Sequence, residues 1–237
     1  AKGINTLVEM VSDLGDIIVC APEGPRSGKS RAFSMTELTL REIPSHDFGD
    51  NVRIYACSGT PVDCIKIACG VFNDRQPDLI LGGINHGDNA STNAHYSGTC
   101  GIAFEGAIKG IPSIAFSLCD YDMDADFEPM RELVRTKCQE VLRDGLPHLT
   151  FLNINVPKVT NASELKGIRT CRMADGVWLN EVEKIDDKTD ADGRPLYQLK
   201  GYFHNNEPDA EDTDAWAIAN GYVAVTPATI DITAYNK

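Results

Sequence analysis

The sequence predicts a Rossmann-like α/β fold, in which a mostly parallel sheet carries helices on both faces and C-terminal β-hairpin arms follow. Two observations lead to this expectation. Between residues 16 and 156, short apolar runs typical of buried strands alternate with helical patterns. After Pro157, strand-like segments follow one another without helices between them. We therefore expect an α/β core over residues 1–158, and C-terminal β arms and a tail used in oligomerisation over residues 159–237.

The core elements are expected in alternating order. The chain opens on a helix, with apolar residues at helical spacing from Ile4 to Leu14 and a stop at Gly15. Residues 33–43 are better interpreted as extended structure, and Pro61 suits the first turn of a helix. The strands are expected at residues 16–21, 52–57, 78–81, 113–118 and 149–156, and the other helices at residues 62–72, 98–108 and 127–143.

An opening helix leaves the first strand of a βαβ unit unaccounted for. A parallel α/β core without that strand would expose apolar faces of its neighbours. We therefore expect a further strand ahead of Ala1.

The C-terminal third has a different pattern. Strands are expected at residues 167–173, 177–185 and 196–203, with a hairpin turn at Asp192-Gly193, and a last strand at residues 221–227. Long antiparallel arms are not stable alone and need a surface to pack on. We therefore expect a homodimer or homotetramer joined by these arms. The acidic segment at residues 205–214 is expected to be exposed.

Composition excludes several classes of function. The net charge of −13 leaves no basic excess for a nucleic acid polymer, although small phosphorylated substrates remain compatible with it. No apolar run approaches the roughly 20 residues that span a bilayer, so no membrane partner is expected. The eight cysteines form no C-x-x-C pair and lie mostly in apolar patterns, which indicates a reducing compartment. We expect a cytoplasmic protein.

Residues 79–106 carry the densest set of polar groups. An apolar strand ends at Gly82-Gly83, and a small-residue helix begins just after Ser97-Gly98-Thr99. Ligands of open α/β sheets bind at the carboxyl ends of strands, and a helix start suits an anion such as phosphate. The polar residues between the two elements are Asn85, His86, Asp88, Asn89, Ser91, Thr92, Asn93 and His95. These are also ordinary loop residues, but a simple turn would not need so many.

The loop GPRSGKS at residues 24–30 superficially resembles a phosphate-binding P-loop. Its spacing is wrong, because only three residues separate Gly24 from Gly28 instead of four. Pro25 also removes one of the N–H groups that such a loop uses. We therefore do not expect a nucleoside triphosphatase.

With both loops in view, the chain resembles the SurE family of stationary-phase survival proteins, which are metal-dependent nucleotidases and acid phosphatases. The resemblance extends over nearly the whole chain, and the motifs occur in the order of the family. They are APEGPRSGKS at residues 21–30, SGTPVDC at residues 58–64, GGIN-H-G-D-N at residues 82–89, YSGT at residues 96–99, EG at residues 105–106, and DTD with GYVAVTP near the end.

The resemblance implies roles for individual residues. Ser27 and Asn85 correspond to ligands of the family's single divalent metal ion, Mg²⁺ or Mn²⁺. The positions that line the phosphate end of the family's pocket correspond to Asn89, Ser97, Gly98 and Thr99. As neutral ligands, Ser27 and Asn85 bind a cation weakly, so most of the affinity has to come from carboxylates.

The chain departs from the family in two places. The family's other two metal ligands are adjacent aspartates in an N-D-D-G motif, one of which is the usual nucleophile or base. That motif is absent from the 237 residues, and Asp186-Asp187 lies in a predicted hairpin. Either an N-terminal strand is omitted, or the protein is a variant without catalysis. The opening helix favours the first interpretation. The second departure is N-A-S-T-N-A-H at residues 89–95, where the family commonly has a glycine and an acidic residue.

Other loop residues have two interpretations. His86 and His95 either contact the leaving group or are simply solvated, and solvation is the commoner case. Asp88 either supplements the missing carboxylates or stabilises the turn after Gly87.

Arg26 and Lys29 either attract phosphate or are solvated surface charges. Cys64 is expected to be a core residue instead of a nucleophile, because no histidine is near it in sequence. Asp212 and Asp214 are expected to fix the tail on a partner subunit, with exposed acidic solubility as the alternative.

These observations predict a phosphomonoesterase that hydrolyses nucleoside 5′-monophosphates with one Mg²⁺ or Mn²⁺. The resemblance also implies activity on 3′-nucleotides and short polyphosphate. The alternative is a nucleotide-binding or assembly protein on the same fold without catalysis.

Overall fold

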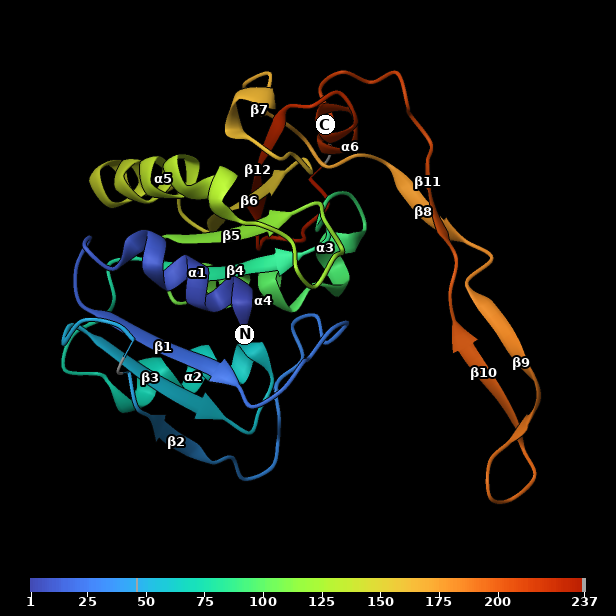
Figure 1. Ribbon diagram of the computed structural model, residues 1–237, viewed down its shortest axis with the longest axis horizontal. Coiled ribbons are helices and arrows are strands. Elements are labelled where there is room, and N and C mark those ends of the chain that lie inside the picture. Colours follow the sequence, from blue (N-terminus) through green and yellow to red (C-terminus); the bar gives the residue numbers. More distant parts are fainter. Residues whose placement is uncertain (46, 236–237) are drawn as a thin grey trace.

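Two sheets form the core of the computed structural model, which describes residues 1–45 and 47–235 (Figure 1). The smaller sheet has the order β1-β3-β2, from β1 (Ile17–Pro22), β3 (Val52–Cys57) and β2 (Leu40–Ile43). The larger has the order β4-β5-β6-β12-β7, from β4 (Ile80–His86), β5 (Ser113–Leu118), β6 (Thr150–Val156), β12 (Val223–Thr229) and β7 (Ile168–Thr170). Most neighbouring pairs are parallel; the antiparallel ones are β2–β3 and β6–β12. The α/β class and mostly parallel pairing are thus confirmed.

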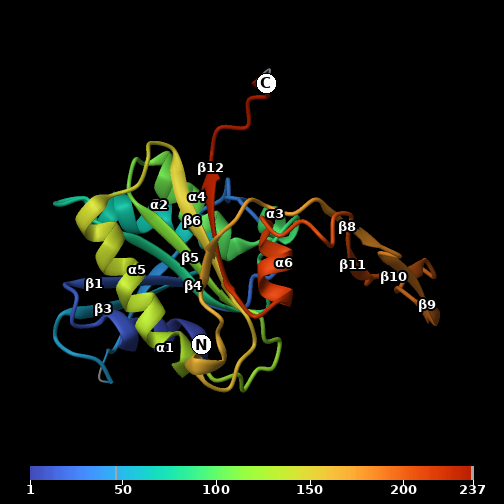
Figure 2. The same cartoon turned by 90° about the horizontal axis from the view of Figure 1, so that it is seen from above.

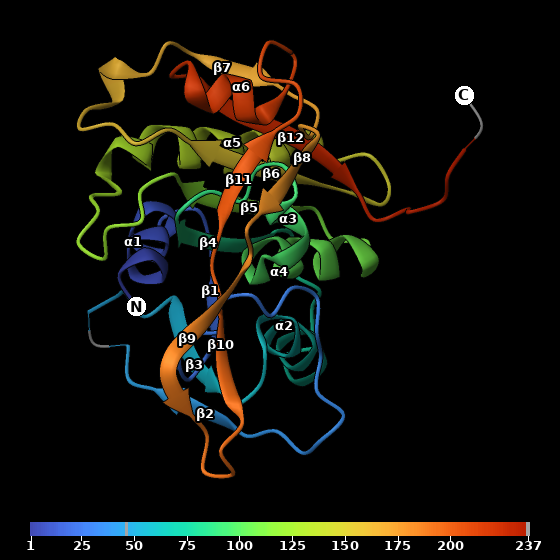
Figure 3. The same ribbon diagram turned by 90° about the vertical axis from the view of Figure 1, so that its right-hand side faces the viewer.

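Helices cover both faces of the sheets (Figure 3). On one side lie α1 (Lys2–Val11) and α5 (Arg131–Asp144), and on the other α2 (Pro61–Val71) and α4 (Gly98–Ile108). Strand β5 is buried at every residue, which explains its almost unbroken apolar sequence. The short helix α3 (Asn93–Tyr96) leads directly into α4.

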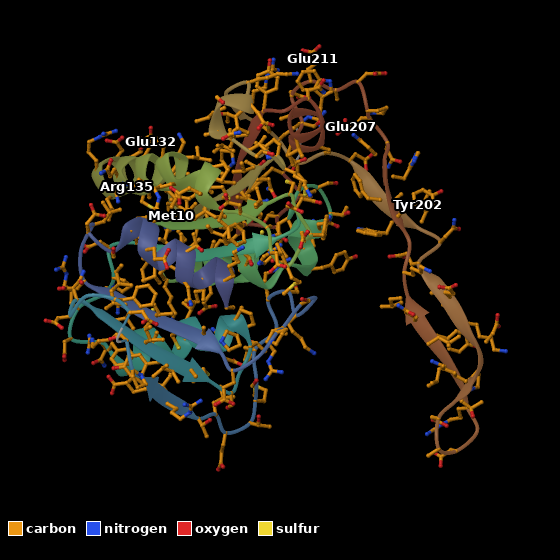
Figure 4. All side chains as sticks on the ribbon, in the orientation of Figure 1. Met10, Glu132, Arg135, Tyr202, Glu207 and Glu211 are labelled. Atoms are coloured by element: carbon orange, nitrogen blue, oxygen red, sulfur yellow. The ribbon has the colours of Figure 1, made fainter. Side chains whose placement is uncertain are left out.

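Helix α1 spans the division between the two sheets. Leu7 and Met10 pack in the large apolar cluster beside β4 to β6, while Val8 packs with Val19 and Val52 of the smaller sheet. The Arg135 guanidinium donates to the Met10 carbonyl at 2.8 Å, which joins α5 to α1 (Figure 4). The opening helix is therefore well packed by both sheets.

The position of α4 depends on small residues and one half-buried ion pair. A Cβ on Gly82 of β4 would lie 2.6 Å from the Thr99 carbonyl oxygen, so only glycine permits this approach. On the other side, Lys66 of α2 contacts Glu105 of α4 at 2.8 Å, and Glu105 is buried. These contacts fix the first turn of α4 against β4 and its last turns against α2.

The C-terminal segment forms an arm that extends from the core (Figures 1 and 2). It consists of two antiparallel pairs: β8 (Gly176–Leu179) with β11 (Tyr202–Asn205), and β9 (Val182–Thr189) with β10 (Pro195–Leu199). The strand expected at residues 177–185 is thus divided in two. The break occurs where Asn180 has φ +55° and Gly201, on the returning strand, has φ +133°.

Three expectations were wrong in detail. Helix α5 begins at Arg131, after a 3-10 turn over Glu128–Met130, instead of at residue 127. A short helix α6 (Asp214–Ala219) follows the acidic segment, and Asp214 is buried instead of exposed. The segment after residue 158 also supplies β7 and β12 to the core sheet. Of the helices that the structure describes, none has the length and apolar character to cross a membrane.

Candidate functional site

The GPRSGKS loop after β1 packs against the junction of α3 and α4. The Ser30 amide donates to the Tyr96 carbonyl at 3.0 Å, and the Ser30 hydroxyl donates to the His95 carbonyl. A Cβ on Gly98 would lie 3.8 Å from the Arg26 carbonyl oxygen and 2.9 Å from the Pro61 ring. The loop that carries Ser27 is thereby brought beside the amino end of α4, about 70 residues further along the chain.

Arg26 joins two of the motif loops. Its Nη2 donates to the Ser58 carbonyl at 3.1 Å, and its Nε lies 3.4 Å from the Gly59 carbonyl oxygen. Arg26 therefore has a structural role instead of the two roles considered from the sequence, phosphate attraction and solvated surface charge. Its guanidinium holds the GPRSGKS loop on the SGTP turn.

The amino end of α4 has the features of an anion site. Ser97 is the N-cap, and its Oγ accepts a hydrogen bond from the Cys100 amide at 3.1 Å. Among the described residues, no acceptor is found for the Gly98 and Thr99 amides. Two open N–H groups at the positive end of an 11-residue helix favour a phosphate oxygen.

Asn85 ends β4 with its amide held in one orientation. Its Nδ2 donates to the His86 carbonyl at 3.0 Å and to the Gly87 carbonyl at 2.8 Å. Within the described part of the chain, no donor is bound to Asn85 Oδ1, so this oxygen is free to accept a ligand. No described contact joins Asn85 to Ser27, which is exposed on its own loop.

The donors present fit a divalent metal only in part. A serine hydroxyl and an amide oxygen are hard ligands of the kind that Mg²⁺ and Mn²⁺ bind. However, residues 1–45 and 47–235 contain no cluster of three or more His, Cys, Asp or Glu side chains that could hold a metal. The described residues therefore offer no acidic cluster that would supply the negative charge such an ion requires.

Asn89 is buried in a network of amide side chains at the ends of β5 and β6. Its backbone amide donates to Asn155 Oδ1 at 2.7 Å, and its carbonyl accepts from Asn153 Nδ2 at 2.8 Å. Its own Nδ2 donates to Ser117 Oγ at 2.7 Å. These bonds assign Asn89 to anchoring the loop, with its amide oxygen left for any contact with substrate. The signal for this network was the pair of polar residues within the buried strand LTFLNINV.

Both carboxylate oxygens of Asp88 accept hydrogen bonds from other residues of the chain. Oδ1 accepts from Asn93 Nδ2 at 2.9 Å and from the Ala90 amide at 3.2 Å, and Oδ2 accepts from the Tyr121 hydroxyl at 2.7 Å. Desolvation at the hydroxyl end and the hydrogen bond to this carboxylate raise the pKa of Tyr121, although most of its ring is exposed. The geometry therefore favours the turn-stabilising role of Asp88 over a role as a metal ligand.

Asp214 lies within the chain and holds three segments together. Oδ2 accepts from the Ser91 amide at 2.9 Å, and Oδ1 accepts from the Ala174 amide at 2.9 Å and the Ala215 amide at 2.8 Å. Burial raises the pKa of this carboxyl group. The expectation that Asp214 contacts a partner subunit was therefore wrong, because its oxygens are used inside the chain. Because the sequence around Asp214 is acidic, it gave no signal that this residue is buried.

Asp212 also has a partner in its own chain, at the base of the arm. Its Oδ2 accepts from Arg172 Nε at 2.8 Å, and the same guanidinium pairs with Glu207. The exposed Asp212 thus belongs to an intrachain ion-pair group.

The histidines and Cys64 have defined surroundings. His86 Nδ1 lies 2.8 Å from the Asp122 carbonyl oxygen, and its ring meets the Phe127 ring edge-on at 4.8 Å between centroids. His95 contributes its carbonyl to Ser30. Cys64 is fully buried, and the adjacent Cys20 thiol and burial raise its pKa, as expected of a core residue.

Comparisons with known proteins agree with this arrangement. The sequence model of the family described as "Survival protein SurE" matches residues 1–180. The protein named 5′-nucleotidase SurE from Bacteroides fragilis is 48% identical over 236 residues, which cover 100% of this chain and 89% of the relative. The protein of the same name from Bacteroides thetaiotaomicron is 47% identical, with 99% and 88% covered. The crystal structure of the SurE protein from Aquifex aeolicus superimposes with a TM-score of 0.79 at 35% identity, covering 99% of this chain and 91% of that one.

Proposed function

Because the chain belongs to the SurE family, we propose that it is a 5′-nucleotidase, which hydrolyses nucleoside 5′-monophosphates to nucleoside and phosphate. The observation that carries this proposal is the amino end of α4, where the Gly98 and Thr99 amides are open beside the GPRSGKS loop. Relatives that carry the name 5′-nucleotidase support the same reaction over the full length of the chain.

Phosphate recognition follows from the chain's own groups. The two open amides and the helix dipole bind two of the phosphoryl oxygens and fix the phosphorus atom relative to the loops. The Ser97 hydroxyl accepts from the Cys100 amide, and its own proton remains available for a third oxygen. The hydrogen bonds of Asn89 hold the loop between β4 and α3 on strands β5 and β6. These donors stabilise the negative charge that develops on the transferred phosphoryl group.

Family membership supports metal dependence, and we assign two neutral ligands of one Mg²⁺ or Mn²⁺ to Ser27 and Asn85. When bound, such an ion polarises a phosphoryl oxygen and activates water. Since the described residues add no acid cluster to these two oxygens, we derive no step through the ion. We expect this chain to bind Mn²⁺ weakly.

Phosphate release from AMP and GMP tests the proposal. We expect turnover that depends on added Mn²⁺ or Mg²⁺ and is inhibited by inorganic phosphate. The lack of an acid cluster among residues 1–45 and 47–235 favours a second candidate, a nucleotide-binding or assembly protein without catalysis. Saturable binding of GMP with no phosphate release at millimolar Mn²⁺, even with the native N-terminus restored, would identify that second candidate and exclude the first. The same assay applies to 3′-nucleotides and short polyphosphate, which we propose as further substrates.

The extended arm supports assembly into a dimer or tetramer. Apolar side chains on it are exposed in the single chain, namely Val177, Val182, Leu196, Tyr197, Leu199 and Tyr202. Tyr202 lies on the part of the arm that extends away from the core (Figure 4). We propose that a second copy covers these residues, since a two-stranded ribbon needs a packing surface. Light scattering of Leu199→Asp against Asp192→Asn, a change at the polar hairpin turn, tests this assignment. A monomer is expected only for Leu199→Asp.

We propose that the protein is cytoplasmic. All eight cysteines are unpaired thiols, as is typical of a reducing compartment.

A further inference from the structure

The Tyr121 ring is exposed to solvent, yet contacts fix both its hydroxyl and its edge. Its exposed fraction is 68%, yet its hydroxyl donates to Asp88 Oδ2 at 2.7 Å. The edge of its ring lies against the backbone of Gly87, where a Cβ would overlap the ring. Gly87 has φ +88°, so glycine is required here both for conformation and for space. The ring thus loses its rotational freedom before any ligand arrives.

The segment that carries Tyr121 is itself tied to the end of β4. The Gly87 amide donates to the Leu118 and Asp120 carbonyls at 2.8 and 2.9 Å. His86 Nδ1 lies 2.8 Å from the Asp122 carbonyl oxygen. On the outer side, Lys158 pairs with Asp120 at 3.0 Å. The ring therefore stands on a segment fixed on both sides.

This ring is directly connected to the candidate site. The carbonyl of Gly87, whose backbone contacts the ring edge, accepts from Asn85 Nδ2 at 2.8 Å. Asp88, which holds the hydroxyl, also accepts from Asn93 at the start of α3, and α3 leads into the anion-binding end of α4. Tyr121 thus contacts the same loop that joins the proposed metal ligand Asn85 to the proposed phosphate site.

From this geometry we propose that Tyr121 is the surface on which the base of the nucleotide stacks, with the phosphate at α4. The proposal rests on the proposed function and adds the part of the site that distinguishes a nucleotide from other phosphomonoesters. A fixed ring with an open face binds a base with little loss of conformational entropy. Stacking on one aromatic residue is favourable for any base, because every base has a π face.

The test compares GMP with ribose 5-phosphate, which has the same phosphate and sugar but no base. In Tyr121→Ala we expect the Kd and KM for GMP to rise roughly tenfold, which corresponds to about 1.4 kcal/mol. The Kd for ribose 5-phosphate and the inhibition constant of inorganic phosphate should not change. Tyr121→Phe keeps the ring and should retain most of the affinity for GMP.

Tyr235→Ala is the matched control. Tyr235 is also highly exposed, and its hydroxyl donates to a carboxylate, Asp231 Oδ2, at 2.5 Å. It lies in the C-terminal tail, which leads away from the core (Figure 3). We expect wild-type affinity for both ligands in this variant.

Three results would overturn the proposal. Equal weakening of GMP and ribose 5-phosphate in Tyr121→Ala would mean that the ring only supports the loop. Unchanged GMP binding in that variant, or equal affinity of the wild-type protein for the two ligands, would show that no base stacks there. If no phosphomonoester is hydrolysed, the proposed function fails by itself, because equilibrium binding of the two ligands still tests Tyr121.

Discussion

The Ser91 backbone amide donates a hydrogen bond to Asp214 Oδ2 at 2.9 Å, across 123 residues of sequence. The bond is buried, and the Ser91 hydroxyl donates to the Ala174 carbonyl beside it at 2.8 Å. One carboxylate thus connects the candidate site loop, the approach to the arm and helix α6. The base of the arm and the site are parts of one hydrogen-bonded unit.

Asp214→Asn is expected to destabilise the protein by about 1–3 kcal/mol, because the amide NH2 group cannot accept and leaves a buried backbone N–H unpaired. Denaturant unfolding measures this change. Asp212→Asn, at an exposed ion pair, is the control and should cost less than about 1 kcal/mol. Equal losses in the two variants would contradict the role given to Asp214.

Glu207 should make the stability depend on pH in the acid range. The Arg172 guanidinium and the Asp175 amide lower the pKa of Glu207 from its ordinary value of 4.5 to about 2. Since the folded pKa is the lower one, the stabilisation is present above about pH 4.5 and is lost as the pH falls toward 2.

Melting temperatures between pH 2 and 6 check this prediction by comparing the wild type with Glu207→Gln. The difference between them should be greatest near pH 6 and should shrink on acidification. Glu211→Gln, an exposed residue nearby, should follow the wild type throughout (Figure 4). A constant difference between wild type and Glu207→Gln would contradict the assignment.

Gly101→Ala is expected to separate the GPRSGKS loop from α4. Its Cβ would overlap the Ser30 carbonyl oxygen and lie 3.2 Å from the Ser30 carbonyl carbon. We expect a loss of stability of about 1–3 kcal/mol and a higher inhibition constant for inorganic phosphate. Gly70→Ala is the matched helical control, since no atom lies within 4 Å of its Cβ. It should stabilise the protein by about 0.5–1 kcal/mol, and an equal gain from Gly101→Ala would exclude a close contact with the loop.

Asn85 variants separate the ligand role from the structural one. Asn85→Ala should lower Mn²⁺ affinity and the rate of phosphate release together. Asn85→Asp keeps an oxygen and adds the negative charge that the described site lacks, so it should bind Mn²⁺ more tightly than the wild type. Isothermal titration with Mn²⁺ alone measures both changes. Unchanged Mn²⁺ affinity in both variants would remove Asn85 from the metal site.

Much of the core was predictable because its signals are local. The apolar runs of β5 and β6 indicated buried strands, and Pro61 with Thr60 marked the start of α2. The helix start at Ser97 was also local, since a capping serine and small residues define it. The choice of α/β class required only the alternation of such segments.

The order of the C-terminal strands and the partners of polar side chains depended on the tertiary structure. Strand β12 pairs with β6 and β7, and no residue of GYVAVTP indicates that choice. Acidic residues in a loop look alike in sequence, yet Asp214 is buried under backbone amides while Asp212 is exposed to solvent.

The sequence by itself determined the class of fold, the family motifs and the position of the helix that we propose binds phosphate, because each depends on residues close together in the chain. Only the tertiary structure decided that Asn89 and Asp214 anchor the loop between β4 and α3 and that Tyr121 contacts it. Hydrogen bonds between residues far apart in sequence depend on how the strands are ordered in space, and local sequence carries no record of that order.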